Sequence, residues 1–319
     1  MAWRRYVFSP ALAAAVFLAC GDENGSAGGS PTVPYDAGTK KDASSGSPFV
    51  DSGEEPPDLD AGPDAKAWPT CTAKPASATA KTIPQIWQAD PAKETEVWIA
   101  DAYVTGISSG QCSANEACQL FVQDGTSYSD LASAAKHAIK LFVSANTAQY
   151  FTTVAVGDKV DVLGWAWRYD LNGQHELLVQ VNYMLPGCAK TKSKANTLTP
   201  LAGLELSQLS LDVYENTHGP LFVKLENVSG RPGTPKETFG LWPTPDGGPF
   251  DGGFVDAGGA NIVSASPFFL PGGSFTDLAA GVPTRFTSIT GVFGLFVPMG
   301  GPKYLEIYAR TPDDIVVAP

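Results

Sequence analysis

Histidine is scarce in this 319-residue sequence, which has only three histidines, at positions 137, 175 and 218. The chain contains no His-Glu-x-x-His motif and no glycine-rich phosphate loop before a helix. The string GISSG at residues 106–110 matches Gly-x-Ser-x-Gly, but it leads into a Gly-Gln-Cys loop rather than the strand-to-helix elbow that this nucleophile motif requires. We therefore predict a non-enzyme with no catalytic residues, no metal site and no cofactor.

Basic residues are also few, with 21 Lys and Arg against 33 Asp and Glu, which gives a formal net charge of −12. Nucleic-acid binding draws most of its affinity from clustered Lys and Arg that release counterions from phosphates. An acidic surface repels phosphate chains at long range. Nucleic acid is therefore only a weak candidate partner.

No segment is apolar enough to span a bilayer, which needs roughly 20 apolar residues. Residues 1–20 instead have the pattern of an export signal: Arg4 and Arg5 precede an apolar run that ends at Cys20. The residues around Cys20 (LACGD, 18–22) resemble the lipobox of bacterial lipoproteins. This resemblance implies that Cys20 is diacylated and anchors the protein to the cell envelope, with the outer membrane as the expected location. An ordinary signal peptide is the alternative.

Large apolar side chains are nearly missing from residues 21–67, which are rich in Gly, Ser, Pro, Asp and Ala. Such a segment buries too little apolar surface to offset its ordering entropy. We predict a disordered tether between the anchor and the folded part.

Helical periodicity is rare in residues 68–319, where short alternating runs are separated by Gly and Pro. This pattern predicts an all-β fold, with one short helix expected at 129–137. Five strands and one small helix are the elements of an oligonucleotide/oligosaccharide-binding (OB) barrel. The expected strands of the first barrel are 96–107, 119–124, 139–143, 159–169 and 175–183.

Residues 156–169 join a Gly-Asp turn to a strand whose side chains alternate with period two. Period two places Val160, Val162, Gly164 and Ala166 on one face, and the alternate residues from Asp161 to Tyr169 on the other. The small apolar face suits the interior of a curved barrel, and a glycine in mid-strand marks a bulge or a bend.

Three segments carry a resemblance to a known module: VWIADAYVTG (97–106), LFVQD (120–124) and VGDKVDVLG (156–164). Together they resemble the OB-fold modules of bacterial extracellular proteins. Such modules often precede the catalytic domain of secreted endonuclease/exonuclease/phosphatase-family DNases. The resemblance implies an OB-like barrel at residues 68–192, and we expect no DNase active-site domain beside it. Fold inferred in this way does not fix function.

Residues 193–319 repeat the theme more loosely, through YENTHGPLFVKLENV (214–228), FTSITGVFG (286–294) and YLEIY (304–308). They resemble the segment that follows the OB module in those secreted proteins. We predict a second OB-like β unit, in which Gly291 occupies the place of Gly164. A Gly/Asp-rich stretch at 243–260 carries Asp246, Asp251 and Asp256 at intervals of five. Calcium ligation is one interpretation of these three residues, and we favour the other, a flexible hairpin insertion.

Four cysteines besides Cys20 imply two disulfides in an exported protein, with three possible pairings. We predict Cys112–Cys118, which would close the loop after the first strand, and Cys71–Cys188, which would tie together the two ends of the first barrel. A zinc site made of all four is the alternative, but the Cys-x-x-Cys spacing of such sites is missing.

The remaining functional hypothesis is binding through aromatic side chains. OB barrels present aromatics on an outer face as stacking platforms for bases or sugar rings. Trp165, Trp167 and Tyr169 would form such a ladder, with Arg168 at its rim. Alternatively, the ladder packs under the helix insert or the second unit, as buried aromatics do. We expect a binding or adaptor module with a protein or glycan ligand; the alternatives are an accessory protein of a secreted nuclease and a structural envelope protein.

Overall fold

The computed structural model describes residues 69, 71–170, 175–232, 237–243, 263–270, 273–275, 278, 281–297 and 303–319. The predicted export signal with Cys20, the tether at 21–67 and Asp246, Asp251 and Asp256 lie outside the described residues. No helix in the described part is long and apolar enough to cross a membrane. The described chain is an all-β structure built from two small barrels, as the sequence predicts.

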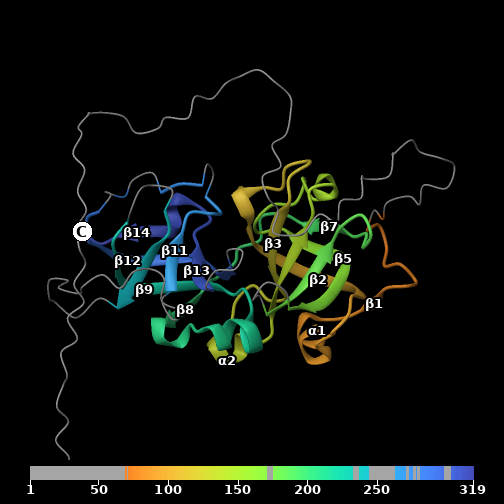
Figure 1. Ribbon diagram of the computed structural model, residues 1–319, viewed down its shortest axis with the longest axis horizontal. Coiled ribbons are helices and arrows are strands. Elements are labelled where there is room, and N and C mark those ends of the chain that lie inside the picture. The colour runs from red at the N-terminus through yellow and green to blue at the C-terminus, as the bar shows by residue number, and fades with distance from the viewer. Residues whose placement is uncertain are drawn as a thin grey trace, which may run out of the picture. The chain divides into compact units, whose positions relative to one another are not determined.

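The first sheet closes on itself as a barrel. Its strand order is β1-β2-β3-β4-β6-β5-β7, and an additional β2–β5 pairing closes the ring of β2, β3, β4, β6 and β5 (Figure 1). Within this ring only β4 and β6 run parallel. This connectivity is that of an OB barrel. The elements are β1 (Thr79–Ala80), α1 (Ile83–Ala89), β2 (Thr95–Ile107), β3 (Cys118–Gln123), α2 (Leu131–Ala134), β4 (Ala138–Val143), β5 (Lys159–Tyr169), β6 (Glu176–Val181) and β7 (Cys188–Ser193).

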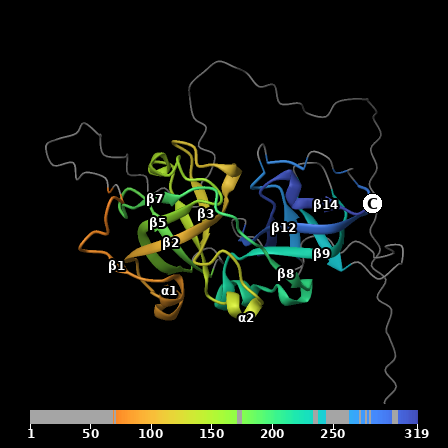
Figure 2. The same cartoon turned by 180° about the vertical axis from the view of Figure 1, so that it is seen from behind.

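The second sheet has the same plan, with order β14-β12-β13-β11-β10-β9-β8 and closure through β12–β9 (Figure 2). Again the third and fifth strands of the ring, β11 and β13, are its parallel pair. The second unit is therefore also an OB-like barrel. Its elements are β8 (Leu201–Leu204), η4 (Val213–His218), β9 (Phe222–Gly230), β10 (Phe239–Pro243), β11 (Val263–Ser266), β12 (Thr284–Phe296), β13 (Tyr304–Tyr308) and β14 (Ile315–Val317).

In chain order, β5 is the fourth of the five strands in the first ring, and β12 is the fourth in the second. Gly164 on β5 and Gly291 on β12 stand at matching places, as predicted. Gly164 pairs with Val97 of the first strand of its barrel, and Gly291 pairs with Val223. A Cβ at Gly164 would lie 2.4 Å from Val179, and a Cβ at Gly291 would lie 2.5 Å from the Tyr308 carbonyl oxygen. Each glycine thus lets the fifth strand approach closely enough to close its barrel.

Helices are less well predicted than strands. The helix expected at 129–137 is limited to one turn, α2, capped by Asp130, whose side chain accepts a hydrogen bond from the Ser133 amide at 2.7 Å. Lys136 then takes a positive φ and ends the helical path. A second helix, α1, was not predicted, although Thr82 caps it in a capping box and proline lies in its first turn.

Both predicted disulfides are present. Cys112–Cys118 closes the loop that follows β2, and Cys71–Cys188 joins the segment before β1 to the start of β7. Cys71 and Cys188 lie in a small apolar cluster with Ala78, Trp98 and Leu163. The second disulfide therefore holds the N-terminal segment on the outside of the barrel, and the alternative zinc site is wrong.

Candidate functional site

The predicted faces of β5 are confirmed by burial. Val160, Val162 and Ala166 lie in the core of the first barrel, each at most 1% exposed. Trp165 and Trp167 point to the other side and are half-buried. The alternation of residues 156–169 therefore places two tryptophans side by side on the outer surface of the barrel.

The aromatic ladder is shorter than predicted. Tyr169 is only 3% exposed, and the Trp167 ring meets it edge-on with 5.3 Å between ring centroids. The Trp165 indole nitrogen donates a hydrogen bond to the Pro186 carbonyl at 3.2 Å. The Trp167 indole nitrogen is buried and has no hydrogen-bond partner among the described residues. Trp165 and Trp167 are the part of the ladder that is partly open to solvent.

Arg168 is engaged within the protein. Its Nε donates to Asp90 at 2.7 Å, its Nη1 donates to the Glu215 carbonyl at 2.7 Å, and the guanidinium lies 5.5 Å from the centre of the Trp87 ring. These contacts connect β5 to the residue that follows α1 and to η4. Arg168 thus positions these elements rather than offering a free cation at the rim.

An exposed apolar loop that no sequence pattern predicts lies near Trp165. Tyr183 and Met184, between β6 and β7, are 53% and 68% exposed. The Asn182 side chain accepts hydrogen bonds from the Met184 and Leu185 amides at 2.9 and 2.8 Å, so the turn is ordered. Pro186 of the same loop accepts from Trp165. The loop shows no periodicity of apolar residues. In the sequence, only the two large apolar residues Tyr183 and Met184 between strands could have indicated it.

The β3 face of the first barrel is covered by the second barrel. Phe121 on β3 is 1% exposed, with its ring centroid 5.0 Å from that of Phe269 and 6.1 Å from that of Tyr308. A Cβ at Gly106 would lie 2.7 Å from Val292 and 2.8 Å from Phe269. Since OB barrels commonly bind ligands across the second and third strands, this contact removes the usual binding face of the first barrel.

A buried polar cluster lies at the same contact. Lys140 on β4 forms an ion pair with Glu176 on β6, and the Tyr214 hydroxyl of η4 donates to the same carboxylate. Burial, followed by the charge of Glu176, raises the pKa of Tyr214 well above its usual value. The phenol therefore stays protonated as a donor, and the cluster joins η4 to the first barrel.

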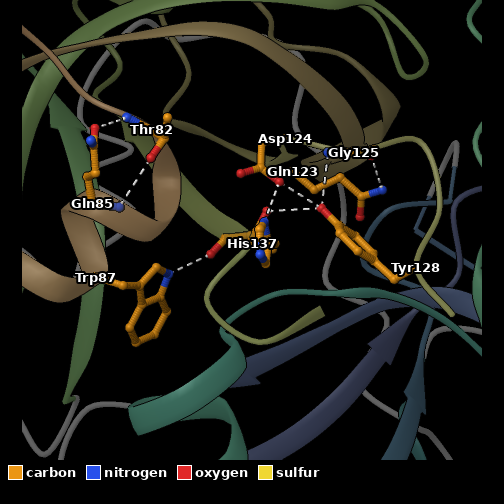
Figure 3. Close-up of polar contacts among 9 residues, drawn as sticks. Thr82, Gln85, Trp87, Gln123, Asp124, Gly125, Tyr128 and His137 are labelled. Carbon is orange, nitrogen blue, oxygen red and sulfur yellow. Dashed lines mark hydrogen bonds and ion pairs between the residues drawn. The ribbon is translucent and has the colours of Figure 1, made fainter. Parts of the chain in front are cut away.

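Asp124, Tyr128 and His137 form the most enzyme-like constellation in the described chain (Figure 3). Asp124 Oδ1 lies 2.8 Å from His137 Nδ1 and accepts from the Tyr128 hydroxyl at 2.9 Å. Burial and the charge of Asp124 raise the pKa of Tyr128, so the phenol remains a donor. The Gly125 amide also donates to the Tyr128 hydroxyl at 3.0 Å. These bonds close the loop between β3 and β4, and no serine or cysteine nucleophile takes part in them.

The other two histidines lie elsewhere. His218 Nε2 donates to the Leu131 carbonyl at 2.7 Å and so holds α2 against η4, while burial lowers the pKa of His218 and keeps it neutral. His175 lies just before β6, and its Nδ1 is 3.6 Å from Asp170 Oδ1. Among the described residues, no group of three or more His, Cys, Asp or Glu is arranged to hold a metal ion.

No protein-family model matches the chain, and no curated protein matches its sequence. Among solved structures, the chain is similar to one described as an aspartyl-tRNA synthetase from Leishmania major Friedlin, at 13% identity and a TM-score of 0.25. That match covers 45% of this chain and 27% of the synthetase chain. Another solved structure, described as "Structural mimicry for functional antagonism", is 6% identical with a TM-score of 0.24, and the match covers 69% of this chain and 91% of that one. Similarities this weak carry no argument about function.

Proposed function

We propose that this protein is an envelope lipoprotein, anchored through Cys20, whose folded part is a non-catalytic binding module for a glycan or for a protein ligand. The observation that carries the proposal is the pair of half-buried tryptophans on the outer face of β5. Adjacent tryptophans left partly open to solvent form an apolar platform that a partner can cover.

A glycan is the ligand that this platform fits best. Indole rings stack on the apolar faces of ring-shaped ligands while their N–H groups serve as donors. The Trp167 indole N–H lacks a partner among the described residues, so it is a donor on this face that no protein acceptor occupies. The net charge of −12 disfavours a phosphate-rich ligand.

Anchoring is supported by the sequence alone. The lipobox-like residues before Cys20 and the Gly/Ser/Pro/Asp-rich tether at 21–67 fit a lipid-held module that stands away from the membrane. A binding module held in this way would act close to the envelope.

An accessory protein of a secreted nuclease is the second candidate, favoured by the resemblance of residues 97–164 to modules that precede DNase domains. Single-stranded nucleic acid would need a basic stacking face. The β3 face of the first barrel is covered at Phe121, and Arg168 is engaged by Asp90 and Glu215. These contacts make the glycan or protein ligand the better proposal.

The test is binding of the full chain to a glycan array, followed by titration of tryptophan fluorescence with the glycans that bind. The Trp165→Ala/Trp167→Ala double variant should bind roughly tenfold more weakly or worse, because loss of one stacking contact costs about 1–3 kcal/mol. Trp242→Ala is the matched control, since Trp242 is a half-buried tryptophan on the second barrel. Equal binding by the wild type and the double variant would contradict the proposal.

A further inference from the structure

Five oxygen-bearing side chains gather on the outer face of the second barrel. Ala265 and Ile307 point into the core, so their neighbours on β11 and β13 point outward. The parallel register pairs Ser264 with Glu306 and Ser266 with Tyr308. Thr238, just before β10, lies beside them with its hydroxyl 3.4 Å from that of Ser266. We call this set the Glu306 site: Thr238, Ser264, Ser266, Glu306 and Tyr308.

Burial raises the pKa of Glu306 to about 7, and the neighbouring side chains of Ser266, Tyr308 and Thr238 favour its charged form. The carboxylate is therefore surrounded by polar side chains from β11, from β13 and from the residue before β10. The strand register and the burial of Ser264, Ser266 and Glu306 fix their places, so the oxygens are preorganised around one point.

Gly294 makes room for one of these side chains. It pairs with Glu306 across β12 and β13, and a Cβ placed on it would lie 2.1 Å from the Tyr308 ring. The ring thus lies directly over the glycine, which pairs with the neighbouring Glu306. Any larger residue at position 294 would push the ring away from the carboxylate.

The site is unbalanced in charge and in hydrogen bonds. Glu306 is only 5% exposed, and no Lys, Arg or His among the described residues forms an ion pair with it. Ser264 is 1% exposed, and its hydroxyl has no hydrogen-bond partner in the described part of the chain. A buried carboxylate without a counter-charge and a buried hydroxyl without a partner each cost free energy. One positive ligand between them would satisfy both groups.

We propose that the Glu306 site binds an alkali-metal cation, Na⁺ or K⁺, through the carboxylate of Glu306 and the hydroxyl oxygens around it. Carboxylate and hydroxyl oxygens are hard ligands, which suit hard cations. A single carboxylate balances a single positive charge, whereas divalent-cation sites gain affinity from additional carboxylates. The free lone pairs of Ser264 supply a ligand that no protein donor occupies.

The proton is the competing occupant, because a protonated Glu306 would also remove the buried charge. Protonation needs no cation, so it predicts the same stability in sodium, potassium and choline salts. Specific cation binding predicts a difference between these salts, and this difference separates the two occupants.

The experiment is thermal unfolding of the full chain at pH 8 in NaCl, KCl or choline chloride of equal ionic strength. A bound cation stabilises the native state in proportion to the logarithm of its concentration above Kd. At about ten times Kd, Na⁺ or K⁺ should raise Tm by roughly 3 °C or more above the value in choline. Glu306→Gln should abolish the difference between salts. Glu226→Gln should keep it, because Glu226 is exposed on β9 beside Lys224.

A direct measurement covers the case in which Glu306→Gln does not fold. Line broadening of the ²³Na resonance by the wild-type chain should be displaced by KCl, and Ser264→Ala should weaken the broadening severalfold. Equal Tm in sodium, potassium and choline salts would overturn the proposal. So would a salt difference that survives in Glu306→Gln, or ²³Na broadening that is the same in Ser264→Ala as in the wild type.

Discussion

The two disulfides should contribute very differently to stability, although both lie in the first barrel. Cys71 and Cys188 are 117 residues apart, whereas Cys112 and Cys118 are 6 apart. A disulfide stabilises mainly by removing conformations from the unfolded chain, and this effect grows with the length of the loop that it closes. We therefore expect the long-range bond to dominate.

The chain-entropy relation gives about 5 kcal/mol for the 117-residue loop and about 2 kcal/mol for the 6-residue loop. The perturbations are the double variants Cys71→Ala/Cys188→Ala and Cys112→Ala/Cys118→Ala. Alanine is the suitable replacement because all four cysteines are at most 3% exposed, and a serine hydroxyl there would be buried without a partner.

Urea unfolding of the full chain, followed by tryptophan fluorescence, measures the two losses against the wild type. The first variant should lose at least 2 kcal/mol more than the second. Part of its loss will come from release of the segment before β1, which packs beside Trp98 and Leu163. If the short-loop variant lost as much stability as the long-loop variant, the loop-closure reasoning would be refuted.

Further predictions concern single positions. Gly164→Ala and Gly291→Ala should each cost about 1–3 kcal/mol in urea unfolding, because a Cβ there meets the fifth strand of its barrel; unchanged stability would contradict the closure argument. Burial raises the pKa of Glu306 from 4.5 to about 7, so the folded chain holds this proton more tightly than the unfolded chain and stability falls as pH rises between these values. The loss should be on the order of 3 kcal/mol in choline buffers, and Glu306→Gln should remove this part of the pH slope; a wild-type slope in the variant would show that another group titrates. Cys20→Ser should move the protein from the membrane fraction to the soluble fraction of cells, and unchanged fractionation would defeat the proposed anchor.

Strand positions were predictable because barrel closure imposes a pattern on them. Val160, Val162 and Ala166 alternate with polar or large residues, and the structure places all three in the core. The glycine of the fourth strand recurs in both barrels for the same steric reason, which made the second barrel recognisable. The four cysteines outside the predicted export signal gave the disulfides, since the loop after β2 and the two ends of the barrel are natural places for them.

The outer surfaces were not predictable, because what covers them lies far away in the sequence. Phe121 is buried by Phe269 and Tyr308, which lie roughly 150 or more residues later in the chain. No local sequence pattern predicts this contact. Tyr169 alternates like Trp167 yet is buried, so period two separates inside from outside but does not separate covered from exposed.

The Glu306 site shows the same limitation. Ser264, Ser266 and Glu306 have the alternation of solvent-facing residues, but they are buried on the outer face of the barrel. Only the parallel register of β11 and β13 places them side by side. Helix α1 is a different case, since Thr82, Pro84 and Gln85 form a readable start signal that the short length of the helix concealed.

The central claim is that the first barrel offers the tryptophan face of β5 to a ligand while its β3 face is covered by the second barrel. Hydroxyl-radical footprinting of the full chain, read by mass spectrometry, tests this claim most directly. Trp165 and Trp167 should be oxidised, and Met184 strongly so, while Phe121 and Tyr308 stay unmodified. Oxidation of Phe121 and Tyr308 at rates comparable to that of Trp165 would contradict the account.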